Sequence, residues 1–207
     1  SFVVAGAPCP SSPLAWDVKA SNQTPTETTS GNNSFAVHNW FTNDPFKVGN
    51  ELATPRPNRE YTYAWTNQWL RERCSPAVFE TAARNDIDAA RANLFAMHNR
   101  MHDWSYHLGF TEATFNLQDD NFGRGGKMND PEQGNANQIT PPDGHPPITN
   151  MYLWQPIAGS FYAPCVDGDF DMSVIAHEYG HAITNRMVAG PRNGLSSPQG
   201  MSESWSD

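Results

Sequence analysis

Two stretches of this chain are expected to form long helices, and apolar positions repeat with a helical period in the first of them. The first stretch predicts a helix over about residues 85–108, with one apolar face in the core and Gly109 as its stop. Its apolar positions, at steps of three and four residues, are Ile87, Ala90, Leu94, Met97, Met101, Trp104 and Leu108. The second stretch predicts a helix that Asp171 or Ser173 caps and that continues to about residue 187 or 188. A further helix is expected to begin between residues 199 and 202.

Loops and short strands are expected in the rest of the chain. Residues 1–60 are rich in Pro, Ser, Thr and Asn, which indicates loops with a few edge strands. Residues 119–147 are rich in Gly, Asn, Asp and Pro, which also indicates loops. Residues 148–154 predict a strand, with Tyr152 and Trp154 on one face and Met151 and Leu153 on the other.

Composition narrows the classes of partner. The chain has 207 residues, enough for a core, and a formal net charge of −9. This charge disfavours nucleic acids and anionic membranes as partners, because both need a basic face. No run approaches the roughly 18 apolar residues of a membrane span, and residues 1–7 do not resemble an intact signal peptide. In a secreted protein, Cys9, Cys74 and Cys165 allow one disulfide and one thiol, and the pairing stays open.

The second predicted helix carries His177-Glu178-Tyr179-Gly180-His181. Residues four apart share a helix face, so His177 and His181 can bind one metal ion from the same side. Zinc accepts imidazole nitrogen and carboxylate oxygen in a tetrahedral site and keeps a position for water when only three protein ligands bind it. Glu178 is placed to take a proton from that water, so the pattern indicates zinc-assisted hydrolysis with Glu178 as the general base.

The last predicted helix supplies a candidate for the third ligand. Glu203 follows a helix stop and a short loop, so its helix can fold back onto the metal side of the preceding one. Asp207 lies four residues further on the same helix face. It is expected to hydrogen-bond the outer nitrogen of a ligand histidine and to select the tautomer of that histidine.

These residues resemble the Glu-zincins, and their surroundings resemble the fungalysin family of secreted metalloendopeptidases. The similar stretches are Ser12-Pro13-Leu14-Ala15-Trp16, Gly31-Asn32-Asn33, Met101-His102-Asp103, Leu108-Gly109-Phe110, Gly125-Gly126-Lys127, Thr140-Pro141-Pro142-Asp143-Gly144, Asp167-Gly168-Asp169-Phe170, Asn185-Arg186-Met187, Gly190-Pro191 and Gly200-Met201. They run from about residue 12 to the end. Gly180 departs from fungal members, which usually carry Thr there, and is more like bacterial relatives.

The resemblance implies a secreted zinc endopeptidase that cleaves proteins and that an N-terminal propeptide inhibits before maturation. It implies an α+β, zincin-like fold with a cleft between a β-rich N-terminal lobe and a C-terminal helical lobe. Residues 1–83 would be the loop- and β-rich segment, and residues 84–207 would hold the long helix, edge strands and zinc-binding helices. The C-terminal lobe, with the group that stabilises the oxyanion, is expected to be missing from this chain. Asn135, Ala136 and Asn137 resemble the edge strand that pairs with substrate backbone.

Three alternatives remain open. His98 and His102 are also four apart, but no base lies between them, so a buried histidine bonded to Asp103 is favoured over a second metal site. The acidic cluster of Asp167, Asp169 and Asp171 could bind calcium, although helix capping explains the same pattern. The chain could also be a non-catalytic structural or binding protein that retains a zincin scaffold.

Overall fold

The computed structural model describes residues 2–3, 12–38, 51–79, 86–134, 137–160, 164–189 and 201–206. The α-helices are α1 (Gln68–Arg71), α2 (Ile87–His107), α3 (Met172–Ala189) and α4 (Met201–Ser206). Short 3-10 helices span Pro76–Phe79, Glu112–Thr114 and Gly168–Phe170. The strands are β1 (Phe2–Val3), β2 (Ser34–Ala36), β3 (Glu60–Tyr61), β4 (Glu132–Gly134), β5 (Gln138–Ile139), β6 (Ile148–Thr149), β7 (Leu153–Trp154) and β8 (Val166–Asp167).

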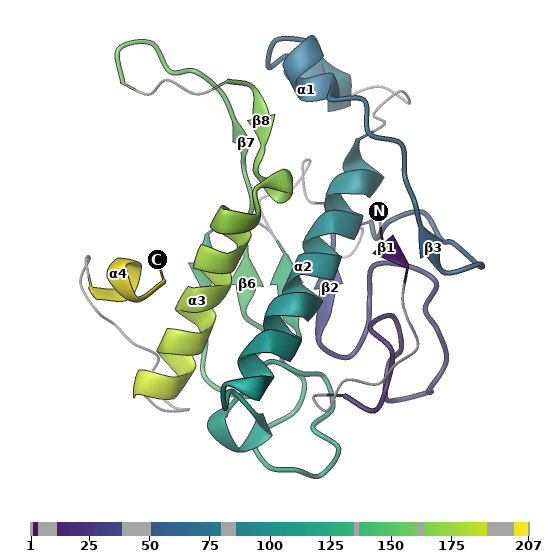
Figure 1. The fold of residues 1–207 in the computed structure, drawn as a ribbon, viewed down its shortest axis with the longest axis vertical. Helices are drawn as coiled ribbons and strands as arrows, with labels where there is room; N and C mark the ends of the chain where they lie inside the picture. Colours follow the sequence, from purple (N-terminus) through teal and green to yellow (C-terminus); the bar gives the residue numbers. More distant parts are fainter. Residues whose placement is uncertain are drawn as a thin grey trace.

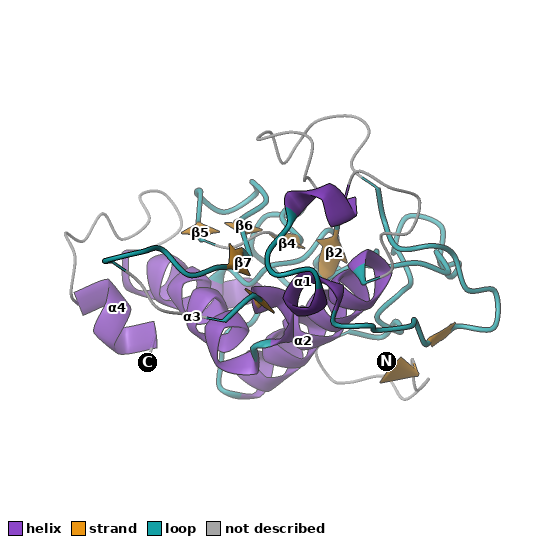
Figure 2. Ribbon diagram, turned by 90° about the horizontal axis from the view of Figure 1, so that it is seen from above, coloured by secondary structure: helices purple, strands orange, loops and turns teal. Residues whose placement is uncertain are grey.

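A small four-stranded sheet lies over the two long helices (Figures 1 and 2). Its strand order is β2-β4-β6-β5. The first three strands are parallel, whereas β5 is antiparallel to β6 and forms one edge. Ala36 of β2, Leu94 and Phe95 of α2 and Ile175 of α3 pack in one buried cluster between the layers. The mixed helices and strands agree with the predicted α+β class.

The predicted helices are confirmed, with ends within a few residues. Gly109 follows α2 with φ of +104°, a conformation that favours glycine and ends the helix. Asp171 caps α3, because its Oδ1 accepts the Ser173 N–H at 3.0 Å. The last helix, α4, begins at Met201, inside the predicted interval. Local capping chemistry therefore determines the ends of α2 and α3.

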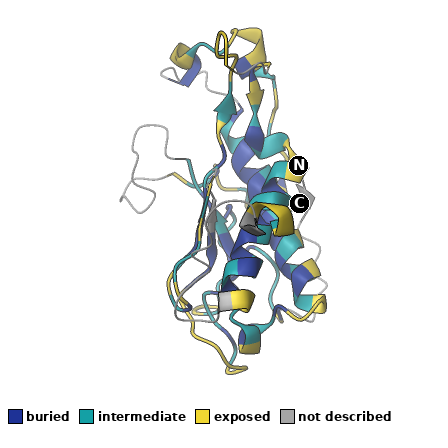
Figure 3. Ribbon diagram, turned by 90° about the vertical axis from the view of Figure 1, so that its left-hand side faces the viewer, coloured by how far each residue is buried: buried dark blue, intermediate teal, exposed yellow. Residues whose placement is uncertain are grey.

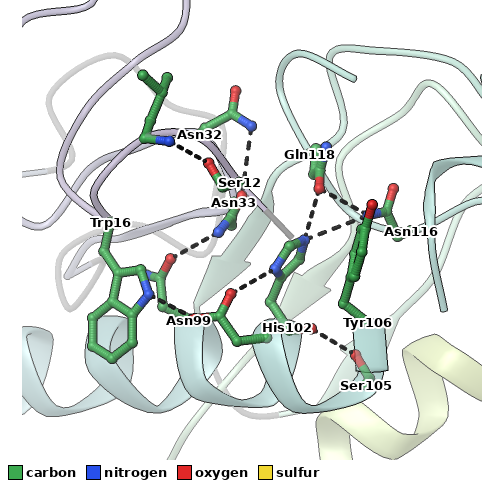
Figure 4. Close-up of polar contacts among 12 residues, drawn as sticks. Ser12, Trp16, Asn32, Asn33, Asn99, His102, Ser105, Tyr106, Asn116 and Gln118 are labelled. Atoms are coloured by element: carbon green, nitrogen blue, oxygen red, sulfur yellow. Dashed lines mark hydrogen bonds and ion pairs between the residues drawn. The ribbon is translucent and has the colours of Figure 1, made fainter. Parts of the chain in front are cut away.

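The predicted buried face of α2 is correct only in its first half. Ala90 and Leu94 are buried, but Trp104 and Leu108 are 56% and 67% exposed. Buried positions run along the long helices (Figure 3), and Figure 4 shows the polar side chains of Asn99, His102 and Ser105 on the buried face of α2. The buried polar residues of this helix are Arg91, His98, Asn99, His102 and Ser105. The buried face is displaced because loops from distant parts of the sequence supply hydrogen-bond partners for these side chains.

Four contacts illustrate this network around α2. Asn99 Oδ1 accepts from Asn33 Nδ2 at 3.2 Å, and Asp103 Oδ2 accepts from Trp16 Nε1 at 3.0 Å. His102 Nδ1 lies 3.4 Å from Asp103 Oδ1, and His102 Nε2 lies 3.0 Å from Gln118 Oε1 (Figure 4). The structure thus supports the buried, hydrogen-bonded histidine over a second metal site.

The predicted strand over residues 148–154 is wrong as a single element. It is divided into β6, in the four-stranded sheet, and β7, which pairs with β8 in a separate two-stranded sheet. The backbone changes partner after Asn150. The Asn150 N–H still donates to the carbonyl of Asn137, beside β5, at 2.7 Å, but the Tyr152 carbonyl accepts from the N–H of Gly168, just after β8. Two strands, β4 and β5, also lie in the stretch predicted as loop. Strands of two or three residues are too short to produce a visible alternation.

Cys74 and Cys165 form a disulfide, which settles the open pairing. Trp69, Val78 and Phe79 pack with Cys165 in a second buried cluster. The disulfide therefore joins the α1 segment to the loop beside β8. Cys9 lies outside the described residues. Within the part of the chain that the structure describes, no helix is both long and apolar enough to cross a membrane.

Several ionisable side chains are buried near the sheet. Glu132 of β4 is fully buried, and burial raises the pKa of its carboxyl to about 8. Arg186 of α3 is also buried and donates to Asp130 at 2.8 Å, with Asp143 Oδ1 at 3.5 Å. Burial raises the pKa of Asp130 to about 6, although the Arg186 guanidinium opposes this change. These groups connect α3 to the segment before β4 and to the loop between β5 and β6.

Glu132 should make the protein less stable at alkaline pH. Because its folded pKa is raised, its contribution to stability is full below about pH 4.5 and is lost as pH rises through about 8. Between about pH 6.5 and about pH 9, the wild type should lose about 2 kcal/mol more unfolding free energy than Glu132→Gln. Urea unfolding at both pH values measures this loss.

The matched control is Glu60→Gln, which replaces an exposed carboxylate. It should retain the pH dependence of the wild type. Asp130 and Asp167, whose pKa values burial raises to about 6, titrate mostly below this interval. If the wild type and Glu132→Gln lost the same unfolding free energy on going to alkaline pH, Glu132 would not titrate in this way.

Candidate metal centre

His177 and His181 face each other across one turn of α3. Their ring planes are nearly perpendicular, and their Nε2 atoms are 3.1 Å apart. Glu203 of α4 places Oε2 3.1 Å from His177 Nε2 and 3.4 Å from His181 Nε2. Among the described residues, these three form the group of side chains that could hold a metal ion. The structure therefore brings together the three ligands predicted from the sequence.

The three donor atoms fit a zinc ion. Zinc–ligand bonds of about 2.0–2.1 Å in a tetrahedron place the ligand atoms about 3.3 Å apart, close to the three observed separations. Two imidazole lone pairs and a carboxylate oxygen at these distances repel one another unless a cation or a proton lies between them. With three protein ligands, a tetrahedral ion keeps one position for a water or a substrate oxygen.

The opposite side of α3 anchors the ligand face. Ile175, Tyr179 and Ala182 are fully or almost fully buried, whereas His177 and Glu178 are only partly buried. Tyr179 and Ala182 pack with Phe110 and other apolar residues in a third buried cluster. The apolar residues within and before the motif thus turn both histidines toward α4.

Ser206 contacts the outer nitrogen of one ligand histidine. Its Oγ lies 2.9 Å from His181 Nδ1. A neutral imidazole that offers the Nε2 lone pair to a metal carries its hydrogen on Nδ1, so a metal-bound His181 would donate to Ser206. This kind of contact was predicted for Asp207, which lies outside the described residues, and not for Ser206. Its signal was the spacing of three from Glu203, which places both on one helix face.

Gly180 lets α4 approach α3 closely. A Cβ atom at this position would lie 3.1 Å from Ser206 Cα and 3.2 Å from Ser206 Cβ, tighter than ordinary van der Waals contact. The glycine therefore accommodates the helix that carries Glu203 and Ser206.

Glu178 lies between the metal ligands and the edge strand. Its carboxylate accepts a hydrogen bond from the backbone N–H of Gln138, the first residue of β5. Burial raises the pKa of Glu178 above its ordinary value, whereas the two ligand histidines and the Gln138 N–H oppose that rise. The contact with Gln138 has no signal in the sequence, because it depends on how β5 packs against α3.

Of the three residues predicted to bind substrate, the structure describes only Asn137. Asn137 is exposed, and its carbonyl accepts from Asn150 N, so the pairing of β5 with β6 uses that carbonyl. Asn135 and Ala136 lie outside the described residues. Ile139 of β5 is 51% exposed beside this edge.

The acidic cluster before α3 makes capping contacts. Asp167 Oδ1 accepts the Asp169 N–H at 3.0 Å at the start of the 3-10 helix, and Asp171 caps α3. Burial raises the pKa of Asp169 well above its ordinary value, and the neighbouring Asp167 adds to the rise. Among the described residues, this cluster is not part of a metal-ligating group, so the calcium hypothesis gains no support.

The comparison with known proteins supports the relationship that the motifs suggested. A sequence model described as Fungalysin metallopeptidase (M36) matches residues 1–207. This chain belongs to the fungalysin family. It is similar to extracellular metalloproteinase 5 of Trichophyton tonsurans, with 35% identity over 95% of this chain and 31% of that protein. It is also similar to extracellular metalloproteinase 4 of Arthroderma otae, with 37% identity over 87% of this chain and 27% of that protein.

A third relative is the extracellular metalloproteinase MEP of Pyricularia oryzae. It is 36% identical over 95% of this chain and 30% of that protein. The chain thus spans less than a third of the length of these curated relatives.

Proposed function

We propose that this chain carries the metal ligands and the general base of a secreted zinc endopeptidase. The observation that supports this proposal best is the convergence of His177, His181 and Glu203 beside Glu178. Membership of the fungalysin family and relatives named extracellular metalloproteinases support the same activity and an extracellular location. The substrates would be internal peptide bonds of proteins.

Each residue of the site would have a separate role in peptide hydrolysis. Bound zinc supplies a Lewis acid that lowers the pKa of a water and polarises the scissile carbonyl. His177, His181 and Glu203 would hold the ion, and Ser206 would keep His181 in the tautomer that binds through Nε2. Glu178 would take the proton from the water and pass it to the leaving amine.

The edge of the sheet suggests how a peptide would bind. Asn150 N–H donates to Asn137 O, so the next residue, Gln138, is at a non-hydrogen-bonded position relative to β6. Its backbone groups therefore point away from β6, toward the open edge. A peptide could add there as another strand, with Asn135, Ala136 and Asn137 beside it.

We further propose that residues 1–83 and 84–207 belong to one zincin-like lobe. Support comes from the sheet, since β2 from the first segment pairs with β4 from the second. The C-terminal helical lobe and inhibition by an N-terminal propeptide stay predictions. The alternative, a non-catalytic zincin scaffold, is less favoured because it has no need of an intact Glu178 beside the ligands.

Zinc content tests the proposed function. The purified protein should contain about one zinc ion per chain, and a chelator should remove both the zinc and the hydrolysis of a protein substrate. Added zinc should restore both. His181→Ala should lose the ion, whereas His107→Ala, which changes an exposed histidine of α2, should keep it. A metal-free preparation with full activity would rule out the zinc mechanism.

A further inference from the structure

The side chain of Thr149 joins two residues beneath the sheet. Thr149 is fully buried on β6, and its Oγ lies 2.8 Å from Glu132 Oε1 and 2.5 Å from Gln138 Oε1. A hydroxyl has one hydrogen, so it can donate to only one of these oxygens. The other partner must donate to Thr149, either as a protonated Glu132 or as a reversed Gln138 amide. Both arrangements produce a continuous chain of hydrogen bonds from Glu132 to Gln138.

The row of hydrogen bonds from Glu132 through Thr149 ends at Gln138, on the strand beside Glu178. Gln138 and Thr149 are direct cross-strand partners at a non-hydrogen-bonded pair, where facing side chains are closest. The Gln138 side chain points inward to Thr149, while its N–H points outward to the Glu178 carboxylate. Gln138 thus connects the buried residues Glu132 and Thr149 to Glu178, the proposed general base.

The strand needs such an anchor because it is short and lies at an edge. β5 contains only Gln138 and Ile139, and among the described strands it pairs only with β6. Ile139 is half exposed, so apolar burial stabilises this strand little. By contrast, Glu132 is on β4, in the interior of the sheet, and is fully buried. The hydrogen bonds through Thr149 therefore attach an edge strand to an interior strand of the sheet.

We propose that Glu132 and Thr149 are positioning residues that hold Gln138, and with it β5, so that the Gln138 N–H faces the Glu178 carboxylate. This inference deepens the proposed function and rests on it, since its consequence for catalysis requires Glu178 to be the base. Displacement of β5 would change both the orientation of Glu178 and the edge along which a peptide binds. Small displacements of a positioned catalytic group lower turnover strongly.

The test compares Thr149→Val with Thr149→Ser in the zinc-loaded protein. Valine keeps the shape but removes the hydroxyl, whereas serine keeps the hydroxyl. Thr149→Val should speed hydrogen exchange of the Gln138 amide by about tenfold, as expected for the loss of one buried hydrogen bond. It should also lower kcat on an internally quenched peptide by about tenfold to a hundredfold, with a change in KM of no more than about threefold. Thr149→Ser should restore both values.

A second variant keeps the proposal testable if Thr149→Val does not fold. Gln138→Met removes the side-chain contact at a partly exposed position and should reproduce the faster exchange of the residue 138 amide and the lower kcat. Zinc content should stay at the wild-type value in all variants. If exchange and kcat are the same in Thr149→Val, Gln138→Met and the wild type, the positioning proposal is wrong, while wild-type hydrolysis still supports the proposed function. If the wild type binds zinc but cleaves no peptide, the proposed function fails, and the exchange rates alone decide whether β5 is anchored in this way.

Discussion

Glu178→Gln is expected to keep the zinc and to lose nearly all peptide hydrolysis. Glutamine has the shape of glutamate and can still accept the Gln138 N–H, so the packing between α3 and β5 should persist. It cannot take a proton from water, and general-base catalysis contributes about 10²- to 10⁴-fold to rate. The measurements are kcat on a peptide substrate and the zinc content of the same sample.

Glu72→Gln is the matched control for this change. It removes a carboxylate that is exposed at the end of α1, and it should leave both kcat and zinc content unchanged. If Glu178→Gln kept the turnover of the wild type, another group would have to be the base. If it lost zinc together with activity, Glu178 would have a role in metal binding that the geometry does not assign to it.

Arg186→Met is expected to be the most destabilising single change away from the metal ligands. Arg186 is 1% exposed, and its Nη1 donates to Asp130 while its Nη2 donates to the His145 carbonyl at 3.1 Å. Methionine would leave Asp130 and Asp143 buried without their cation. Removal of one partner of a buried ion pair costs about 3–5 kcal/mol of unfolding free energy. Urea unfolding of the folded chain measures this loss.

Two further variants separate the charge from general effects of substitution. Arg100→Met changes an exposed arginine of α2 and should alter the unfolding free energy by no more than about 0.5 kcal/mol. Asp130→Asn combined with Arg186→Met should recover part of the loss, because fewer uncompensated charges remain buried. A loss in Arg186→Met no larger than that in Arg100→Met would show that the buried ions do not stabilise the packing of α3.

Much of the candidate site follows from local sequence rules. The spacing of His177 and His181 places both on one face of a helix, and the Asp171 cap helps to set where that helix begins. Glu203 needed one more assumption, namely that the last helix folds back. The structure places its Oε2 3.1 Å from His177 Nε2 and 3.4 Å from His181 Nε2, as expected for atoms that share one metal ion. Chemistry that depends on neighbours along one helix is readable from sequence, because the 3.6-residue period determines which side chains meet.

Contacts between distant segments were not readable in this way. His98 and Asn99 are buried against Ser34 and Asn33, which lie more than 60 residues earlier in the sequence. The two short strands that flank residues 135–136 lacked the length for a periodic signal. Pairing of Cys74 with Cys165 depended on how the α1 segment meets the β8 loop.

The sequence by itself determined the two long helices, the shared face of His177 and His181, and the family to which the chain belongs. Only the tertiary structure decided what surrounds that face. It placed Ser206 on the outer nitrogen of His181, Gly180 under α4, and the Gln138 N–H against Glu178. The physical reason is that helix formation and capping act over a few residues, whereas these contacts join elements that meet only when the sheet and helices pack together.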